Sequence, residues 1–442
     1  MSRYIINGGK QLKGEVSIRG AKNASFKQII ASMLTDKTVK LNNVPQISDV
    51  KITASIAKSL GCQVKETGEH CLELITPKIT NSTVPSGTGE KSRTSFIFAA
   101  PLLSRTGTAI IPTPGGDKLG DRPLDRLFNC FSKMNIKVSE TENSIILNTD
   151  KIIGTHYTFP KPSHTVTEVI IMTAVLASGE TIIDNAALEP EIDDLILMLN
   201  KMGAKIQRDI TDKKRILIQG VSSLNGTEHD VICDRNEIVT FACAALATKG
   251  SICILRIKPE VVKTFLEVIE TMGAQVKTGN DEICIEWVKP LTGITIKTGP
   301  EPMFMTDWQA IFTILLTQTV GCSSIIEAVY PNRFQHIENL KKMGAKFNFF
   351  NPKVADPENY YQFNKESDRP EYFHGVKIYG PTKLKPANFV IKDLRAGASA
   401  TVAALTAQGE SIVDGVEYIE RGYEKLAERL LALGANIEYI KK

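Results

Sequence analysis

The sequence predicts an α/β protein of two domains, in which buried helices are surrounded by β-sheets. One sequence pattern recurs six times at intervals of roughly seventy residues: an apolar helical stretch, a Met-Gly-Ala-like turn, then a strand. The turns begin at Leu60, Met134, Met202, Met272, Met343 and Leu433. At 442 residues the chain is longer than one hydrophobic core usually serves, so we expect the six copies to divide into three and three.

The third copy shows how one repeat is built. Thr167 to Leu176 reads as an apolar helix, and a glycine separates it from a strand at Thr181 to Asp184. An amphipathic helix from Ile192 to Lys201 leads to the strand Lys205 to Gln207. The first helix is apolar nearly all round and should be buried, whereas the second should face water.

Copies four and six repeat this order of helix, strand and helix, with further strands between copies. The predicted elements are Phe241 to Ala247, Ile252 to Leu255 and Val261 to Met272 in copy four, and Ala400 to Ala407, Ser411 to Val413 and Tyr423 to Leu433 in copy six.

Two segments do not fit the repeat pattern. An insert at Asn351 to Phe373 is polar and aromatic and contains three prolines, which predicts a surface loop. In copy two, residues 112–123 are rich in glycine, proline and charge, as in a closing active-site lid. On its own this segment is equally compatible with a solvated surface turn.

The composition indicates a folded, water-soluble protein with 42% hydrophobic and 23% charged residues. A net charge of +4 is too dilute to suggest nucleic-acid binding, but allows a site for an anionic small molecule. The N-terminus lacks a leader pattern, and no stretch approaches the ~20 apolar residues of a membrane span. We therefore expect a cytoplasmic protein without membrane contact.

The eight cysteines occur singly, without a Cys-x-x-Cys pair. This spacing favours buried free thiols in a reducing compartment over disulfides or zinc ligands. We expect no metal site and no cofactor.

Seven short motifs, in one order along nearly the whole chain, resemble those of the enolpyruvyl transferases, and most closely the branch whose acceptor is UDP-N-acetylglucosamine. They lie at Gly20 to Ala24, Gly115 to Pro123, Glu189 to Ile192, Thr306 to Gln309, Asn332 to Phe334, Asp393 to Ala396 and Arg421 to Glu424. The resemblance implies a two-domain inside-out α/β barrel with the active site in the cleft between the domains. One domain would span 22–232 and carry the lid loop 112–123, and the other would comprise 1–21 and 233–442 with the insert at about 351–373.

The activity that this resemblance implies is transfer of the enolpyruvyl group of phosphoenolpyruvate to the 3-hydroxyl of UDP-N-acetylglucosamine, with release of phosphate. This addition–elimination is the first committed step of peptidoglycan precursor synthesis, on which cell wall, cell shape and cell division depend. It needs a cationic pocket, an acid for the methylene carbon and a base for the hydroxyl. The implied partners are these two small molecules, and the oligomeric state is left open.

Site residues are carried over from the matching motifs. For phosphoenolpyruvate they are Lys22, Asn23, Arg122, Arg395 and Arg421, and the catalytic residues are Asp117, Asp307 and Lys22. For UDP-N-acetylglucosamine they are Asn23, Arg93, Arg122, Pro123, Leu124, Asp125, Arg126, Lys161, Pro162, Ser163, His164, Asp307 and Val329. Arg333, Asp393 and Glu191 are expected to support the site.

Asp307 is the expected base, although an Asp ahead of the apolar stretch Trp308 to Leu316 would ordinarily be a helix N-cap, and it could serve both roles. Asp117 is the expected acid, at the lid position where the family usually carries cysteine. An ordinary Asp has a pKa of about 3.9, so the acid role needs an upward shift on lid closure. Without the cysteine, resistance to the alkylating epoxide fosfomycin is expected.

Three alternatives remain open at this level. The first is the sister activity on shikimate 3-phosphate, although that branch carries a Lys-Ser pair where this chain has Lys22 and Asn23. The second is a non-catalytic sensor of nucleotide sugars, which the missing cysteine makes conceivable. An RNA-acting repeat protein is the third, and the dilute positive charge disfavours it.

Overall fold

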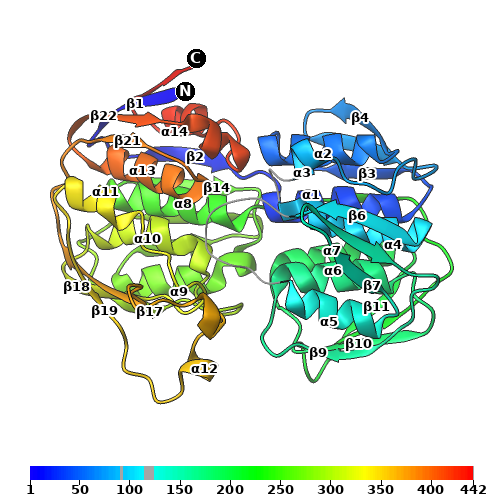
Figure 1. Ribbon diagram of the computed structural model, residues 1–442. Helices are drawn as coiled ribbons and strands as arrows, with labels where there is room; N and C mark the ends of the chain where they lie inside the picture. Colours follow the sequence, from blue (N-terminus) through cyan, green and yellow to red (C-terminus); the bar gives the residue numbers. More distant parts are fainter. Residues whose placement is uncertain (90–92, 114–123, 442) are drawn as a thin grey trace. The chain divides into compact units, whose positions relative to one another are not determined.

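A computed structural model describes residues 1–89, 93–113 and 124–441, which form two compact units (Figure 1). We call residues 1–19 with 233–441 unit 1, and the described residues of 20–113 with 124–232 unit 2.

Unit 1 is built around three buried helices that pack on one another: α8 (Arg235–Ala247), α10 (Gln309–Leu316) and α13 (Leu394–Thr406). Its described residues form three four-stranded sheets. In sheet order these are β15 (Gln275–Thr278), β16 (Glu282–Glu286), β14 (Ser251–Leu255), β2 (Lys13–Ser17); β17 (Thr295–Lys297), β18 (Gly321–Ile326), β20 (Gly375–Gly380), β19 (Lys346–Phe350); and β21 (Asn388–Val390), β22 (Gly409–Asp414), β1 (Arg3–Gly8), β23 (Ile437–Ile440).

The helices near the surface of unit 1 are amphipathic or short. They are η3 (Pro259–Val262), α9 (Lys263–Met272), η4 (Thr306–Trp308), α11 (Ile337–Lys342), α12 (Pro357–Tyr360), η5 (Lys365–Ser367), η6 (Val416–Arg421) and α14 (Leu426–Ala432). In α9, for example, Phe265, Leu266, Ile269 and Met272 face the core at helical spacing.

Unit 2 repeats this design around the buried helices α1 (Lys22–Ala31), α4 (Ala99–Thr106) and α6 (His164–Ala174). Its sheets are β13 (Thr227–Asp230), β3 (Val39–Asn42), β5 (Cys71–Ile75), β4 (Gln63–Gly68); β6 (Thr108–Pro112), β8 (Ser144–Asn148), β7 (Lys137–Glu140); and β11 (Lys205–Arg208), β12 (Ile216–Gln219), β10 (Glu180–Asp184), β9 (His156–Thr158). Its other helices are η1 (Ser32–Leu34), α2 (Ser48–Ser59), α3 (Ser86–Gly89), η2 (Arg93–Phe98), α5 (Asp125–Lys133) and α7 (Pro190–Lys201).

Every copy follows the predicted order of buried helix, strand, outer helix and strand pair, so the repeat and the α/β class are confirmed. The last copy is completed from the other end of the chain, because β1 pairs antiparallel with both β22 and β23. The N-terminal segment therefore belongs to the sixth repeat.

The six turns share one backbone conformation. Five of them use a glycine with positive φ, such as Gly203 at 96°, and the second copy uses Asn135 at 63°. Asparagine is among the non-glycine residues that best tolerate this left-handed region. The turn can thus be kept without glycine in copy two.

Buried helices begin earlier than the apolar pattern predicts. Helix α8 starts at Arg235 rather than Phe241, and α13 starts at Leu394 rather than Ala400. Their first turns carry polar residues that are nevertheless buried, such as Arg235 at 1% and Glu237 at 3% exposure. Such residues interrupt an apolar pattern without interrupting the helix.

The insert at Asn351 to Phe373 lies at the surface, as predicted, and is attached to unit 1 at a few points. It contains α12, and the Gln362 amide donates to the Ala328 carbonyl at 2.7 Å. Tyr361 is buried between Phe363 and His374, with ring centroids 4.8 and 4.9 Å away. Most described residues of the insert are exposed or half-buried, and α12 buries none of its residues, so the predicted surface segment is confirmed with a short helix within it.

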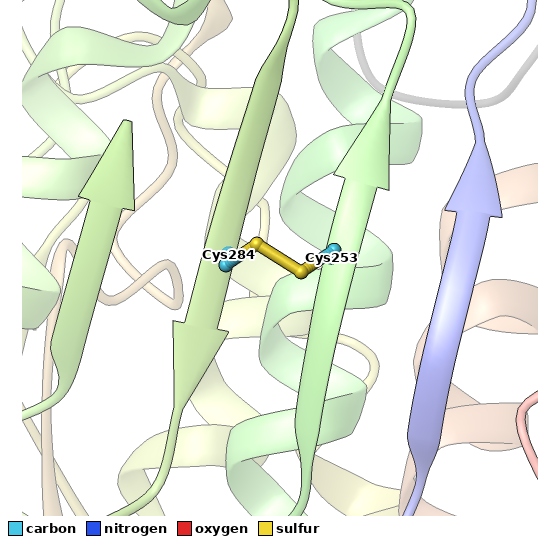
Figure 2. Close-up of a disulfide and its surroundings, with 2 residues drawn as sticks. All are labelled: Cys253 and Cys284. Atoms are coloured by element: carbon cyan, nitrogen blue, oxygen red, sulfur yellow. A yellow bond between two sulfur atoms is a disulfide. The ribbon is translucent and has the colours of Figure 1, made fainter. Parts of the chain in front are cut away.

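The prediction that all eight cysteines are free was wrong. Cys253 of β14 and Cys284 of β16 form a disulfide across the sheet, as Figure 2 shows. The strand register places them directly opposite each other, with Cα atoms 4.0 Å apart. Spacing along the sequence cannot show this proximity, because it depends on the pairing of two strands. The other cysteines in the described part of the chain are free.

Among the described residues, no helix is both long and apolar enough to cross a membrane.

Candidate functional site

In unit 1, Asp307 lies against two arginines from distant parts of the chain. Arg333 Nη2 donates to Asp307 Oδ1 at 2.8 Å, and Arg395 Nη2 donates to Oδ2. Arg333 is almost fully buried, whereas 27% of the Arg395 side chain is exposed. The two guanidinium groups thus share one carboxylate, and the partly exposed Arg395 can offer hydrogen bonds to an anion.

Asp307 is not a helix cap, so the predicted capping role was wrong. It lies inside the single turn η4, and neither η4 nor α10 has a side-chain hydrogen bond at its N-cap. Its carboxylate is bonded to guanidinium groups instead. The η4 turn moves the start of α10 past Asp307.

Asp393 is the residue that caps a helix. Its Oδ1 accepts from the Ala396 amide at 2.8 Å, at the N-cap of α13. Such a cap is worth about 1 kcal/mol. It also fixes the first turn of α13, which carries Arg395.

Glu327 anchors the same region from within. This carboxylate is 1% exposed and accepts from the hydroxyls of Thr298 at 2.9 Å and Thr306 at 2.8 Å. It also accepts from the backbone amides of Val329 and Tyr330. Burial raises the pKa of Glu327, while Arg333 and these hydrogen bonds oppose the rise. Glu327 thereby ties the residue before Asp307 to the loop that contains Val329.

Arg421 is the last residue of η6, which packs on α13. Tyr423, two residues later, bonds to Thr240 through its hydroxyl at 2.8 Å. Burial raises the pKa of Tyr423, and Arg395 lies near enough to oppose this rise. The neighbourhood of Arg395 and the end of η6 are therefore close together.

In unit 2, Lys22 and Asn23 begin α1. Lys22 Nζ lies 2.6 Å from Asp49 Oδ2, in the first turn of α2. Asp49 is 3% exposed, so it is a buried partner that fixes the lysine.

The segment from Lys161 to His164 leads into α6, with Ser163 as its N-cap residue and without a side-chain cap. Arg126 of α5 donates to the Lys161 carbonyl at 3.1 Å, and the Tyr157 hydroxyl donates to the Arg126 carbonyl at 3.0 Å. Burial lowers the pKa of Arg126. These contacts place Arg126 beside Lys161, which Pro162, Ser163 and His164 follow directly in the chain. Leu124 and Asp125 lie at the start of α5.

Some predicted residues cannot be placed. Asp117, Arg122 and Pro123 lie outside the described residues. Arg93 is the first residue of η2, and Glu191 is 2% exposed in the first turn of α7. Val329 follows the Glu327 anchor in unit 1.

Sequence reasoning missed Asp49 and Glu327. Asp49 reads as an ordinary acidic residue in a helix first turn, and Glu327 as a polar residue at a strand end. Only their near-complete burial marks them as partners of the site. Across the described ranges, no group of three or more His, Cys, Asp or Glu side chains could hold a metal ion.

The architecture of two units, each with three buried helices enclosed by sheets, is the fold of solved enolpyruvyl transferases. The family model for EPSP synthase (3-phosphoshikimate 1-carboxyvinyltransferase) matches residues 6–430, and the chain belongs to this family.

The chain is also similar to named relatives and to solved structures. The chain is 37% identical to UDP-N-acetylglucosamine 1-carboxyvinyltransferase of Rhodopseudomonas palustris (strain HaA2), and 34% identical to that of Dichelobacter nodosus, with full coverage of all chains. The enolpyruvyl transferase NikO from Streptomyces tendae superposes with a TM-score of 0.85 at 20% identity, covering 100% of this chain and 99% of NikO. EPSP synthase from Acinetobacter baumannii reaches 0.72 at 17% identity, with full coverage of both chains.

Proposed function

We propose that the protein transfers the enolpyruvyl group of phosphoenolpyruvate to the 3-hydroxyl of UDP-N-acetylglucosamine and releases phosphate. The observation that carries this proposal is the full-length identity of 34–37% to relatives that bear the name of this activity. The reaction would begin peptidoglycan precursor synthesis in the cytoplasm.

The contacts of Asp307 and Arg395 support a specific order of events. Arg395 is bonded to Asp307 and partly exposed, so an incoming carboxylate or phosphate can compete for its guanidinium. Loss of this bond would allow Asp307 Oδ2 to accept the proton of the sugar hydroxyl. Arg333, which is more deeply buried, would keep the carboxylate in place through Oδ1.

Lys22, Arg395 and Arg421, with Arg122, supply the positive charge for an anionic substrate. Preorganised cations lower the energy of charge that develops in a transition state, because they need not reorient during the reaction. Lys22 is preorganised by Asp49, and Arg395 by the capped first turn of α13. Asp117 would protonate the methylene carbon, and its neutral form must be favoured when the substrates are bound.

The test is phosphate release from phosphoenolpyruvate with UDP-N-acetylglucosamine, with shikimate 3-phosphate, and with neither. Release in the first reaction alone is expected. Release with shikimate 3-phosphate alone would show that this compound, and not UDP-N-acetylglucosamine, is the acceptor. No release in any of the three reactions would support a non-catalytic binding protein.

A further inference from the structure

Unit 2 contains a buried charged group that the proposed reaction does not use. Lys27 of α1 and Glu168 of α6 form an ion pair at 2.5 Å, and their side chains are 3% and 0% exposed. Burying two charges removes their hydration, and an apolar pair of similar size is often as stable or more so. Stability alone therefore gives no reason for a charged pair at this place.

The ion pair has one further partner, His164 in the first turn of α6. Lys27 Nζ lies 3.2 Å from His164 Nε2, within hydrogen-bond geometry. Glu168 Oε1 lies 3.1 Å from the same nitrogen, one helical turn along α6. The three side chains form a triad in which two helices hold the imidazole at Nε2, a nitrogen that can accept from Lys27 or donate to Glu168 but not both at once.

Of the three side chains in the triad, that of His164 is the most exposed to solvent. While Lys27 and Glu168 are buried, 19% of the His164 side chain is exposed. Asn23 lies one turn before Lys27 on the same face of α1, and Ser163 directly precedes His164. His164 therefore lies next in sequence to one residue expected to contact the nucleotide sugar, and its buried partner Lys27 lies one turn from another.

The charges around His164 suit a hydrogen-bond donor. Burial lowers the pKa of the imidazole, but the carboxylates of Glu168 and Glu189 outweigh this effect and the opposing charge of Lys27, so the pKa is raised. Since Nε2 is directed at the two buried partners, the other ring nitrogen is left to carry a proton toward a ligand. An acceptor oxygen of the nucleotide sugar is the matching group.

We propose that Lys27 and Glu168 are positioning residues that hold His164 ready to donate a hydrogen bond to an oxygen of the nucleotide sugar. This inference rests on the proposed function. It makes α1 and α6 a joint platform for the acceptor substrate, with the ion pair as the connection between them.

The test compares His164→Ala, the double variant Lys27→Met with Glu168→Leu, and the triple variant that combines them. The double variant should raise the KM for UDP-N-acetylglucosamine about tenfold, with kcat and the KM for phosphoenolpyruvate within about twofold. If the pair acts through His164, the triple variant should bind no worse than His164→Ala. A matched control removes the Arg208–Asp193 pair elsewhere in unit 2, by Arg208→Met with Asp193→Leu, and should leave all constants unchanged.

Full additivity in the triple variant, or an unchanged KM in the folded double variant, would overturn the proposal. If the double variant does not fold, Glu168→Gln keeps the shape of the side chain and should still raise the same KM several-fold. An unchanged KM in that variant counts equally against the proposal.

A spectroscopic measurement separates this inference from the proposed function. The chain has six histidines, so the ring ¹⁵N signals of His164 can be assigned by their loss in His164→Gln. Those signals should move when UDP-N-acetylglucosamine is added to the wild-type protein, even without turnover. A protein that turns over this substrate while the His164 signals stay unchanged would refute the inference and leave the proposed function standing. If the protein does not turn over the substrate but the His164 signals move, the proposed function is refuted and the inference about His164 stands.

Discussion

The Nη2 atom of Arg333 lies 2.8 Å from Oδ1 of Asp307, and only 4% and 11% of the two side chains are exposed. Arg395 bonds to the other oxygen of the same carboxylate but is 27% exposed. We infer a division of labour in which Arg333 holds Asp307 and Arg395 is available to substrate.

This difference predicts that one of two matched substitutions mainly lowers stability and that the other mainly weakens substrate binding. Arg333→Gln leaves a buried carboxylate short of a partner and should lower the free energy of unfolding by about 3 kcal/mol. Arg395→Gln should affect stability less, but raise the KM for phosphoenolpyruvate about ten- to a hundredfold, as loss of a charged hydrogen bond does. Urea denaturation and steady-state kinetics measure the two effects. Equal stability losses with an unchanged KM would contradict the assignment.

Asp307→Asn should lower kcat by about a hundred- to ten-thousand-fold, because it removes the proposed base while nearly keeping the shape of the side chain. Binding of UDP-N-acetylglucosamine, measured by calorimetry, should remain. Asp356→Asn is the matched control, since Asp356 caps the short helix α12 in the insert. Turnover near the wild-type rate in Asp307→Asn would transfer the base role to another group.

Asp117→Asn should abolish turnover while the nucleotide sugar still binds, because an amide cannot donate the required proton. Wild-type protein should resist inactivation by fosfomycin, and Asp117→Cys should acquire time-dependent, covalent inactivation. Intact-protein mass spectrometry detects the adduct. An adduct on the wild-type protein would show that another nucleophile occupies the site.

His336 should make the protein less stable in mild acid. Burial, and next the charge of Arg333, lower the pKa of this imidazole to about 3. Above pH 6.5 neither state is protonated, so the full stability is present; below it the unfolded chain binds a proton that the folded protein does not. This costs about 1.4 kcal/mol per pH unit down to about pH 3.

The measurement is the free energy of unfolding at pH 7.5 and 5.5 for wild type and His336→Gln. The wild type should lose about 1.4 kcal/mol more than the variant over this interval. Parallel pH dependences would mean that His336 titrates normally in the folded protein.

The Cys253–Cys284 disulfide closes a loop with a sequence separation of 31. On the chain-entropy model such a cross-link stabilises the folded state by about 3 to 4 kcal/mol. Dithiothreitol should therefore lower the free energy of unfolding of the wild type. A double Cys253→Ser, Cys284→Ser variant should be less stable than the wild type without reductant, and dithiothreitol should not change its stability. An equal effect of dithiothreitol on the wild type and the variant would show that the effect does not come from this disulfide.

The sequence was sufficient for the repeat, because a turn with positive φ leaves the same residue pattern in each copy. It was insufficient wherever polar side chains are buried. Helix α8 was predicted to begin six residues late because Arg235 and Glu237 interrupt its apolar pattern. The partner roles of Asp49, Glu327 and Glu168 depend on burial, which their local sequences do not display.

The chemistry of the site was less predictable than its location along the chain. Asp307 stands before an apolar helix, and only the structure shows that Arg333 and Arg395 bind it. The disulfide likewise depends on the register of β14 and β16. Long-range pairings of this kind arise from the packing of repeats, whereas a single sequence displays only neighbours along the chain.

The most direct test of the proposed activity is ¹³C NMR of a reaction between phosphoenolpyruvate labelled at C2 and UDP-N-acetylglucosamine. We predict a vinyl ether signal that correlates with the proton on carbon 3 of the sugar, with one phosphate released per product formed, and its loss in Asp307→Asn. If the labelled carbon is joined to shikimate 3-phosphate but not to UDP-N-acetylglucosamine, the proposed acceptor is wrong, and if it stays in phosphoenolpyruvate with both, the proposed transfer is wrong.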